Sequence, residues 1–158
     1  MDLGRRRKAG ESLTGARMVD VGAKPVVPRV AEAQGRLRLR PATTRAIRAG
    51  RLEKGDALEI GRTAAILAAK QTPHLLPLCH PVPLDAVDVS FHVRRDGVQC
   101  RVRVHAQYRT GVEMEALVAV TVGLLTVWDL VKPLEKDAHG QYPTAALENV
   151  RVVRKVKG

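Results

Sequence analysis

The spacing of apolar residues predicts strands at two places along the chain. Residues 36–40 read Arg-Leu-Arg-Leu-Arg, and this strict alternation is typical of a strand with one buried face. Pro41 lacks the backbone N–H that a strand interior needs, so we expect this strand to end there. Residues 149–156 alternate valine with basic side chains, which predicts a final strand.

The clearest local prediction is a β-hairpin in the middle of the chain. Residues 87–93 and 98–104 both carry an apolar side chain at every second position, and Asp96-Gly97 between them is a common turn dipeptide. We therefore expect two antiparallel neighbours. Their shared apolar face would hold Val87, Val89, Phe91, Val93, Val98, Cys100, Val102 and Val104.

Three helices are predicted from period and capping signals. A short helix over residues 43–49 is closed by Gly50, and Asp56 can cap a second helix that runs to about Lys70. We expect one side of this second helix to hold Leu58, Ile60, Ala64, Leu67 and Ala68. A long apolar helix follows over residues 111–130.

The ends of the long helix carry recognisable signals. Thr110 and Glu113 have the spacing of a capping box at its start, and Pro133 is expected to stop it. Strands and helices segregated in this way predict an α+β fold. Our choice is a ferredoxin-like arrangement, in which a four-stranded antiparallel sheet has helices packed on one face.

The chain divides into an arm and one domain. Residues 1–17 are rich in Gly, Arg and Ser without periodicity, which predicts a disordered basic arm, and residues 18–158 are expected to form a single domain. No run approaches the roughly 20 apolar residues of a membrane span. With two cysteines, Cys79 and Cys100, in separate segments, we expect a protein of the reducing cytoplasm that binds no membrane.

The charge changes this picture, because a net charge of +11 and a pI near 10.5 are typical of proteins that bind phosphates. Stacking platforms for nucleic acid need exposed aromatic rings, and only 3% of the residues are aromatic. A small phosphate-rich ligand accounts for the charge equally well. A basic surface that merely keeps the protein soluble is the other alternative.

Candidate chemistry begins in residues 71–84, where four prolines predict an irregular loop. Within it, His80 is suited to proton transfer or ligand binding near neutral pH, although a structural histidine is the commoner outcome. Adjacent Cys79 and His80 cannot easily chelate one ion together, and His74 adds little, so we expect no metal.

Charged residues mark the two ends of the long helix. Glu113 and Glu115 suit its N-terminal dipole and could accept hydrogen bonds from a guanine edge, or they could be a cap partner and a solvated residue. Near its other end, Asp129 and Lys132 share a face, which also fits a simple ion pair. Lys54 lies beside Gly55, where the backbone can turn sharply, and is either solvated or a proton-transfer group.

Taken together, these segments resemble in order and spacing the signature blocks of the MoaC family. The blocks cover about residues 18–132. They read Met18-Val-Asp-Val-Gly-Ala-Lys24, Lys54-Gly-Asp56, Ala68-Ala-Lys70, Leu76-Pro-Leu-Cys-His-Pro81, Thr110-Gly-Val-Glu-Met-Glu-Ala-Leu117 and Leu125-Thr-Val-Trp-Asp-Leu-Val-Lys132. The chain departs from many members in its C-terminal Arg-Lys-Val-Lys-Gly and in a longer segment over residues 135–146, so the match of Lys155 to the first lysine of the usual tail is provisional.

The resemblance implies a lyase of molybdenum cofactor biosynthesis. Its reaction converts 3′,8-cyclo-7,8-dihydroguanosine 5′-triphosphate to cyclic pyranopterin monophosphate and releases pyrophosphate, without a cofactor. The same resemblance implies a homohexamer, built as a trimer of dimers, with active sites at subunit interfaces. A basic nucleic-acid-binding module remains the alternative function.

Residue roles follow from the same resemblance. Lys54 and Lys132 would be the acid and base, and Asp129 the carboxylate that assists them. The pterin precursor would be held by His80, Glu113 and Glu115, with Leu78, Cys79 and Met114 lining its pocket. Arg29 and Lys70 would lie toward the triphosphate.

Helix geometry argues for a shared site independently of the family. Glu113 and Asp129 lie sixteen residues apart, which on a continuous helix is about 24 Å. One compact reacting centre cannot comfortably span that distance within a single chain. An antiparallel partner helix across a two-fold axis would bring the two ends together, unless the helix folds back before Asp129 or one charged pair is merely structural.

Overall fold

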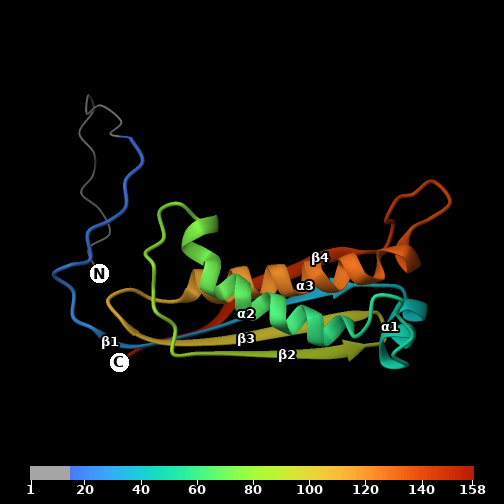
Figure 1. The fold of residues 1–158 in the computed structure, drawn as a ribbon, viewed down its shortest axis with the longest axis horizontal. Coiled ribbons are helices and arrows are strands. Elements are labelled where there is room, and N and C mark those ends of the chain that lie inside the picture. The colour runs from blue at the N-terminus through green and yellow to red at the C-terminus, as the bar shows by residue number, and fades with distance from the viewer. Residues whose placement is uncertain (1–14) are drawn as a thin grey trace.

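The computed structural model describes residues 15–158 and contains a four-stranded antiparallel sheet. Helices cover one face of this sheet (Figure 1). Its strand order is β2-β3-β1-β4. The elements are β1 (Val27–Arg38), α1 (Pro41–Arg48), α2 (Ala57–Leu75), β2 (Ala86–Arg94), β3 (Gly97–Tyr108), α3 (Glu113–Glu135) and β4 (Ala146–Lys157). The predicted α+β, ferredoxin-like class is therefore confirmed. Most of the predicted 1–17 arm lies outside the described residues.

Strand β1 begins nine residues before the predicted strand, and both β3 and β4 pair with it in antiparallel register. The sequence pattern missed the first part of this strand because its inward residues are small. Ala31, Ala33 and Gly35 face the helices, and such small side chains give little hydrophobic contrast. A Cβ on Gly35 would lie 2.8 Å from Val120, so this position requires the close approach of strand and helix.

The predicted hairpin is confirmed as β2 and β3, and its eight apolar residues belong to the core or pack against it. The turn lies one position earlier than predicted. Arg94 pairs with Gly97, so Arg95 and Asp96 form the turn. Gly97 is already in the ladder with Arg38, and a Cβ there would collide with the carbonyl oxygen of Leu37.

Pro41 follows the end of β1 as predicted, but two other predictions about proline were wrong. Pro41 begins α1 in the first helical turn, where a missing N–H costs nothing, as well as following the strand. Pro73 lies inside α2, which continues to Leu75 rather than ending near Lys70. Pro133 lies inside α3, which continues to Glu135. Both internal prolines stand in the last turn of their helix, where only one backbone hydrogen bond is lost before the helix ends.

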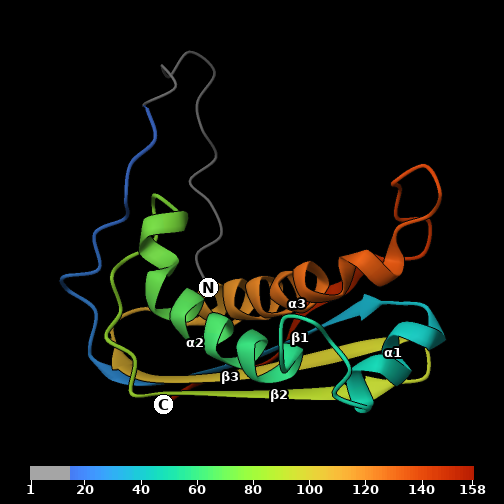
Figure 2. The ribbon, with the colours of Figure 1, turned by 45° about the vertical axis from the view of Figure 1, so that its right-hand side comes forward.

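Small residues let α2 pack closely on α3. A Cβ added to Gly61 would lie 3.2 Å from the carbonyl oxygen of Gly123, and one added to Gly123 would lie 3.1 Å from the Cβ of Ala65. Our assignment of the apolar side of α2 was wrong for Ile60 and Leu67, which are 40% and 58% exposed. The contact with α3 uses the small-residue side instead, and Figure 2 shows the two helices side by side above the sheet.

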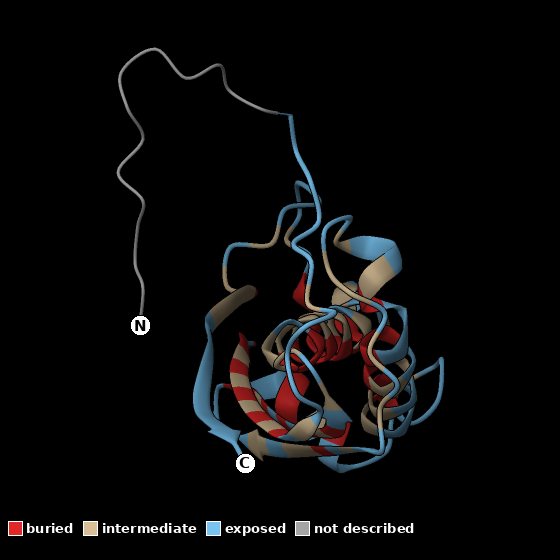
Figure 3. Cartoon of the chain, turned by 90° about the vertical axis from the view of Figure 1, so that its left-hand side faces the viewer, coloured by how far each residue is buried: buried red, intermediate tan, exposed pale blue. Residues whose placement is uncertain are grey.

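Helix α3 is the centre of the core. Its length and composition would suffice to cross a membrane, but half of its most apolar window is buried inside the protein. Figure 3 shows these buried residues in red between the helices and the sheet. At its end, the fully buried Glu135 accepts hydrogen bonds from the backbone amide of Arg40 and the hydroxyl of Thr43, which ties α3 to the start of α1.

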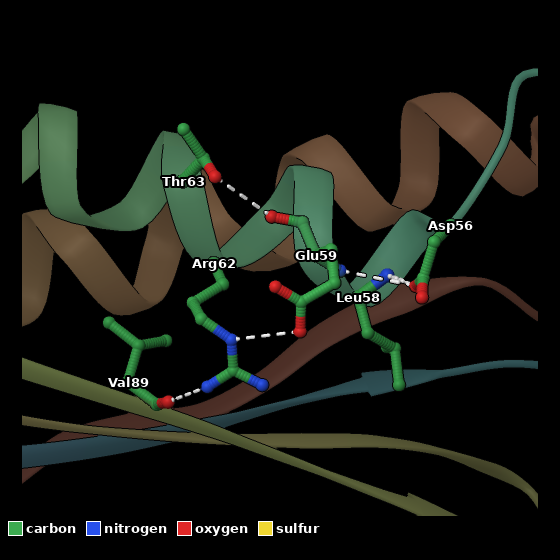
Figure 4. A network of polar contacts seen from close by, with 6 residues as sticks. All are labelled: Asp56, Leu58, Glu59, Arg62, Thr63 and Val89. Carbon is green, nitrogen blue, oxygen red and sulfur yellow. Dashed lines mark hydrogen bonds and ion pairs between the residues drawn. The ribbon is translucent and has the colours of Figure 1, made fainter.

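The N-terminus of α2 is held by a capping residue and by a contact with β2, as Figure 4 shows. Asp56 caps the helix, because its carboxylate accepts from the amides of Leu58 and Glu59 at 2.9 and 3.2 Å. Arg62 donates to Glu59 at 3.2 Å and to the carbonyl of Val89 on β2. The turn that carries Lys54, just before this cap, is therefore held at a defined place over the sheet.

Candidate functional site

A cavity of about 550 Å³ lies at the N-terminal end of α3, beside the loop that follows α2 and the last strand. Six residues predicted from the sequence line it, namely Leu78, Cys79, His80, Glu113, Met114 and Glu115. They come from segments more than thirty positions apart in the chain. The remaining lining residues are Val82, Thr110, Gly111, Val152 and Lys155.

The proline-rich loop presents Cys79 and His80 in fixed positions. The amide of Cys79 donates to the carbonyl of Leu76 at 3.0 Å, and the Nε2 of His80 lies 2.7 Å from the carbonyl oxygen of Val19. That oxygen can only accept, so Nε2 carries the proton and Nδ1 is left toward other partners. Burial, and then the charge of Glu115, raise the pKa of Cys79, so this thiol is a poor nucleophile at neutral pH.

Lys155 reaches the cavity through its place in the ladder between β1 and β4. Ala31 of β1 pairs with Lys155. Ala31 is fully buried under the helices, and Lys155 therefore points to the helix side, where its Nζ contacts the carboxylate of Glu113. The register shift between Glu32 and Ala33 adds Val152 to the same side, because it places Val152, three positions before Lys155, opposite the buried Ala33.

The two glutamates of α3 differ in their surroundings. Burial works to raise the pKa of Glu113, but the hydrogen bond and charge of Lys155, a backbone hydrogen bond and the charge of Arg29 together outweigh it, and the net shift is downward. Glu115 is 3% exposed, and burial raises its pKa. The prediction of a capping box at Thr110 was wrong, because the residue before α3 is Val112 and Glu113 pairs with Lys155 instead. The alternative of a solvated Glu115 was also wrong.

A second charged cluster lies near the other end of α3. The Asp129 carboxylate is 2.7 Å from the Nζ of Lys132 and 3.4 Å from the Nζ of Lys54, which comes from the turn before α2. Gly55 has a φ of 102° in this turn, a backbone conformation that glycine adopts readily. Hydrogen bonding to Lys132 lowers the pKa of Asp129, and the same contact raises the pKa of Lys132. The three residues predicted as catalytic thus meet at one point.

The cavity and this cluster are separate on one chain. Helix α3 is continuous from Glu113 to Glu135, which rules out a helix that folds back before Asp129. At about 1.5 Å per residue, roughly 24 Å separates Glu113 from Asp129. One chain alone cannot apply both groups to the same reacting atoms.

Arg29 and Lys70 do not line the cavity. The Arg29 side chain is buried on β1 and donates to the carbonyls of Tyr108 and Arg109 at 3.3 and 3.1 Å. It fixes the chain just before Thr110 and Gly111, which do line the cavity. Lys70 lies exposed on α2. Within residues 15–158, no group of three or more His, Cys, Asp or Glu residues could hold a metal ion.

Sequence reasoning missed part of the cavity wall. Val152 and Lys155 are three positions apart, so a regularly alternating strand would place them on opposite faces. The register shift that puts both on the cavity side leaves no mark in the hydrophobic pattern. The provisional match of Lys155 to a family tail was the one available signal. Gly111 lies in the family block 110–117, and a Cβ there would collide with the carboxylate of Glu113.

The chain is similar along most of its length to proteins of one known family. The model of the MoaC family matches residues 18–158. A protein of Pyrococcus abyssi named "Probable cyclic pyranopterin monophosphate synthase" is 55% identical over 143 residues, 90% of each chain. One of Aeropyrum pernix with the same name is 52% identical over 146 residues, 92% of this chain and all of its own.

A third relative carries a slightly different name. A protein of Methanothermobacter thermautotrophicus named "Probable cyclic pyranopterin monophosphate synthase accessory protein" is 52% identical over 143 residues, 90% of each chain. Family model and relatives agree along nearly the whole chain. The protein belongs to the MoaC family.

Proposed function

We propose that this protein is a cytoplasmic lyase of molybdenum cofactor biosynthesis, with residues 18–158 as its catalytic domain. It converts 3′,8-cyclo-7,8-dihydroguanosine 5′-triphosphate to cyclic pyranopterin monophosphate and releases pyrophosphate. The names of the relatives and the family match support the reaction. Within this chain, the observation that supports the reaction is the cluster in which Asp129 contacts both Lys54 and Lys132.

The cavity is the proposed binding site for the pterin precursor. Glu115 is buried at its wall with a raised pKa, and a carboxyl group in such a place can pair with the ring nitrogen and amino group of a guanine-derived base. His80 supplies a second polar group, and Leu78 and Met114 supply apolar surface. Lys155, Lys70 and Arg29 add positive charge at this end of the protein, toward the triphosphate.

The lysine cluster is the proposed source of proton transfer. A rearrangement that breaks and forms ring bonds needs a base to take a proton and an acid to return one. Lys54 and Lys132 lie within hydrogen-bonding reach of the same carboxylate, so a proton can be exchanged between them while Asp129 stabilises the charged lysine. Pyrophosphate leaves when a hydroxyl oxygen of the substrate bonds to the α-phosphorus and gives its proton to the base. The leaving group takes the electron pair of the broken P–O bond, and nearby ammonium groups stabilise its charge.

We propose that each complete site forms between two chains. An antiparallel neighbour that packs along α3 would bring the lysine cluster of one chain to the cavity of the other. The helix layer offers apolar surface for this contact, since Leu67 and Leu125 are 58% and 46% exposed. Side chains of this kind are commonly covered in oligomers. The family resemblance extends the dimer to a homohexamer, a trimer of dimers.

The test is turnover of the cyclised nucleotide by the purified chain, without added metal or cofactor, with detection of pyrophosphate. Lys54→Ala and Lys132→Ala should each lower kcat about 10²- to 10⁴-fold, as expected for loss of a proton-transfer group. Lys136→Ala, one turn beyond Lys132, is the matched control and should stay active. An active wild type with fully active Lys54→Ala and Lys132→Ala would keep the reaction but refute these roles. Tight, salt-sensitive nucleic-acid binding without turnover would favour the binding module instead.

A further inference from the structure

We propose that the open face of the sheet, opposite the helices, carries a second binding site for a small phosphorylated anion. A cavity of about 370 Å³ lies there, lined by Gln34, Gly35, Arg36, Arg94, Asp96, Gln99, Asn149 and Arg151. Gln34 and Arg36 alternate on β1 with residues that face the helices, which places the cavity on the other side of the sheet from α3. It is therefore distinct from the candidate active site.

A register shift builds this cavity. Arg36 pairs with Glu148, but Gln34 pairs with Arg151 where a regular ladder would place Val150. The extra residue puts Arg151 on the open face beside Gln34. Asn149, at this irregularity, has a φ of 54°, the one positive φ among the described residues other than glycine. Such backbone conformations persist where the surrounding structure holds them, and they concentrate at binding sites.

The charges in the cavity are not balanced. Arg36 forms an ion pair with Asp96 at 2.7 Å, and this contact lowers the pKa of Asp96, so that pair is neutral as a unit. Among residues 15–158, neither Arg94 nor Arg151 has an ion-pair partner. Arg94 lies on the edge strand β2 and Arg151 on the other edge strand, β4, and both line the cavity. Two guanidinium groups from opposite edges of the sheet suit a ligand with acceptor oxygens at both ends.

Neutral donors complete the site. Arg101 donates to the Oε1 of Gln34 at 3.3 Å, which leaves the NH₂ group of Gln34 free to turn toward a ligand. Gln99 lies opposite Arg36 in the ladder and lines the same cavity. A site with guanidinium and carboxamide donors favours phosphoryl oxygens over a cation or an apolar group.

The surroundings favour a small ligand over a nucleic acid strand. The neighbouring hollow on the same face is lined by Glu32 and Asp88 as well as by arginines. Glu32 already holds Arg103 and Arg154, each at 3.8 Å. A polyanion leaving the cavity along the sheet would meet these carboxylates, whereas a ligand confined to about 370 Å³ would not.

Pyrophosphate is the probe, and the full chain is the sample. Equilibrium dialysis of radiolabelled pyrophosphate measures binding, and labelling of arginine side chains with phenylglyoxal, read by mass spectrometry of peptides, locates it. Pyrophosphate should protect Arg94 and Arg151 from labelling while Arg45 and Arg51, exposed elsewhere, stay reactive. The variant with Arg94→Gln and Arg151→Gln should bind about 100-fold more weakly at this site, about tenfold for each guanidinium lost.

The control variant combines Arg45→Gln with Arg51→Gln, which changes the net charge equally and should bind normally. Protection of all four arginines alike would overturn the proposal, because it would show only diffuse attraction. So would the absence of protection at about 1 mM pyrophosphate, or stronger protection by a short oligonucleotide at equal phosphate concentration. None of these readouts depends on turnover, so this binding site and the proposed reaction are tested independently of each other.

Discussion

Glu113 and Glu115 lie two residues apart at the start of α3, yet their carboxyl groups have opposite electrostatic surroundings. Burial works to raise the pKa of both carboxyl groups, but at Glu113 it is outweighed by Lys155 together with a backbone hydrogen bond and the charge of Arg29, so the pKa of Glu113 is lowered while that of Glu115 is raised. One carboxyl group is thus held ionised and the other is more easily protonated. Two neighbouring carboxyl groups whose pKa values are shifted in opposite directions can perform different tasks in one site.

Glu115→Gln should weaken substrate binding while leaving the fold intact. The glutamine keeps the size of the side chain but loses the acceptor pair that a guanine edge requires. Calorimetry with a non-reacting substrate analogue measures the affinity, which should fall about tenfold or more, the usual loss when a charged hydrogen-bond partner is removed. Unchanged affinity would mean that Glu115 serves the structure alone.

The same substitution gives a second, independent readout in stability. Because the pKa of Glu115 is raised in the folded protein, the fold favours its protonated form, and stability falls as pH rises from the unfolded value of about 4.3 through the folded value. Glu115→Gln removes this loss. The variant should therefore melt at a higher temperature than the wild type at pH 7 and at the same temperature near pH 3. A variant that is less stable at pH 7 would contradict the cost of burying this charge.

Lys155→Met should remove a small, pH-dependent stabilisation. The pKa of Glu113 is lowered in the folded protein, so the stabilisation is present above the unfolded pKa and is lost as pH falls through the folded one. The Lys155 side chain is 58% exposed, so solvent screening limits the effect to about 0.5 kcal/mol. Urea unfolding at pH 7 and pH 3 measures it, with Lys157→Met as the control. Equal destabilisation at both pH values would show that Lys155 contributes packing rather than charge.

Most of the fold could be predicted because most elements bury one clean apolar face. The β2–β3 hairpin shows this, since every apolar position assigned to its inner face packs in the core. Prediction failed where packing relies on small residues. Ile60 and Leu67 look like the buried side of α2 by hydrophobicity, but only the side with Gly61 and Ala65 lets α2 approach α3 closely.

The candidate site could be predicted less completely, for a different physical reason. Family motifs led to the residues on α3 and on the loop after α2, and these do converge on the cavity. Val152 and Lys155 share the cavity wall only because the ladder between β1 and β4 is irregular, and this irregularity follows from hydrogen bonding between strands far apart in sequence. A pattern within one strand cannot report such a shift.

Asp129→Asn should move the pH dependence of the reaction. The hydrogen bond and charge of Asp129 raise the pKa of Lys132, so removing the charge should lower that pKa. The limb of the kcat/KM profile that reports Lys132 should then shift to lower pH. Glu53→Gln, an equal charge change beside Lys54, should leave the profile in place. If this limb does not shift in Asp129→Asn, Lys132 is not the group whose protonation state controls turnover.

Mixing two inactive variants tests whether each site is shared between chains. Glu115→Ala damages the cavity end of α3, and Asp129→Ala damages the lysine cluster about 24 Å away along the same continuous helix. If sites form across a two-fold axis, a dimer of one chain of each kind has both lesions in one site and none in the other. Refolding the two variants together in equal amounts should then restore up to about a quarter of wild-type activity, since half of the dimers are mixed and each carries one intact site of two. Glu113→Ala mixed with Glu115→Ala is the matched control, because both lesions lie at the same end of α3 and every site keeps one of them. Mixed oligomers as inactive as their parents would show that each chain carries its own site, and that one of the two charged clusters on α3 serves the structure rather than the reaction.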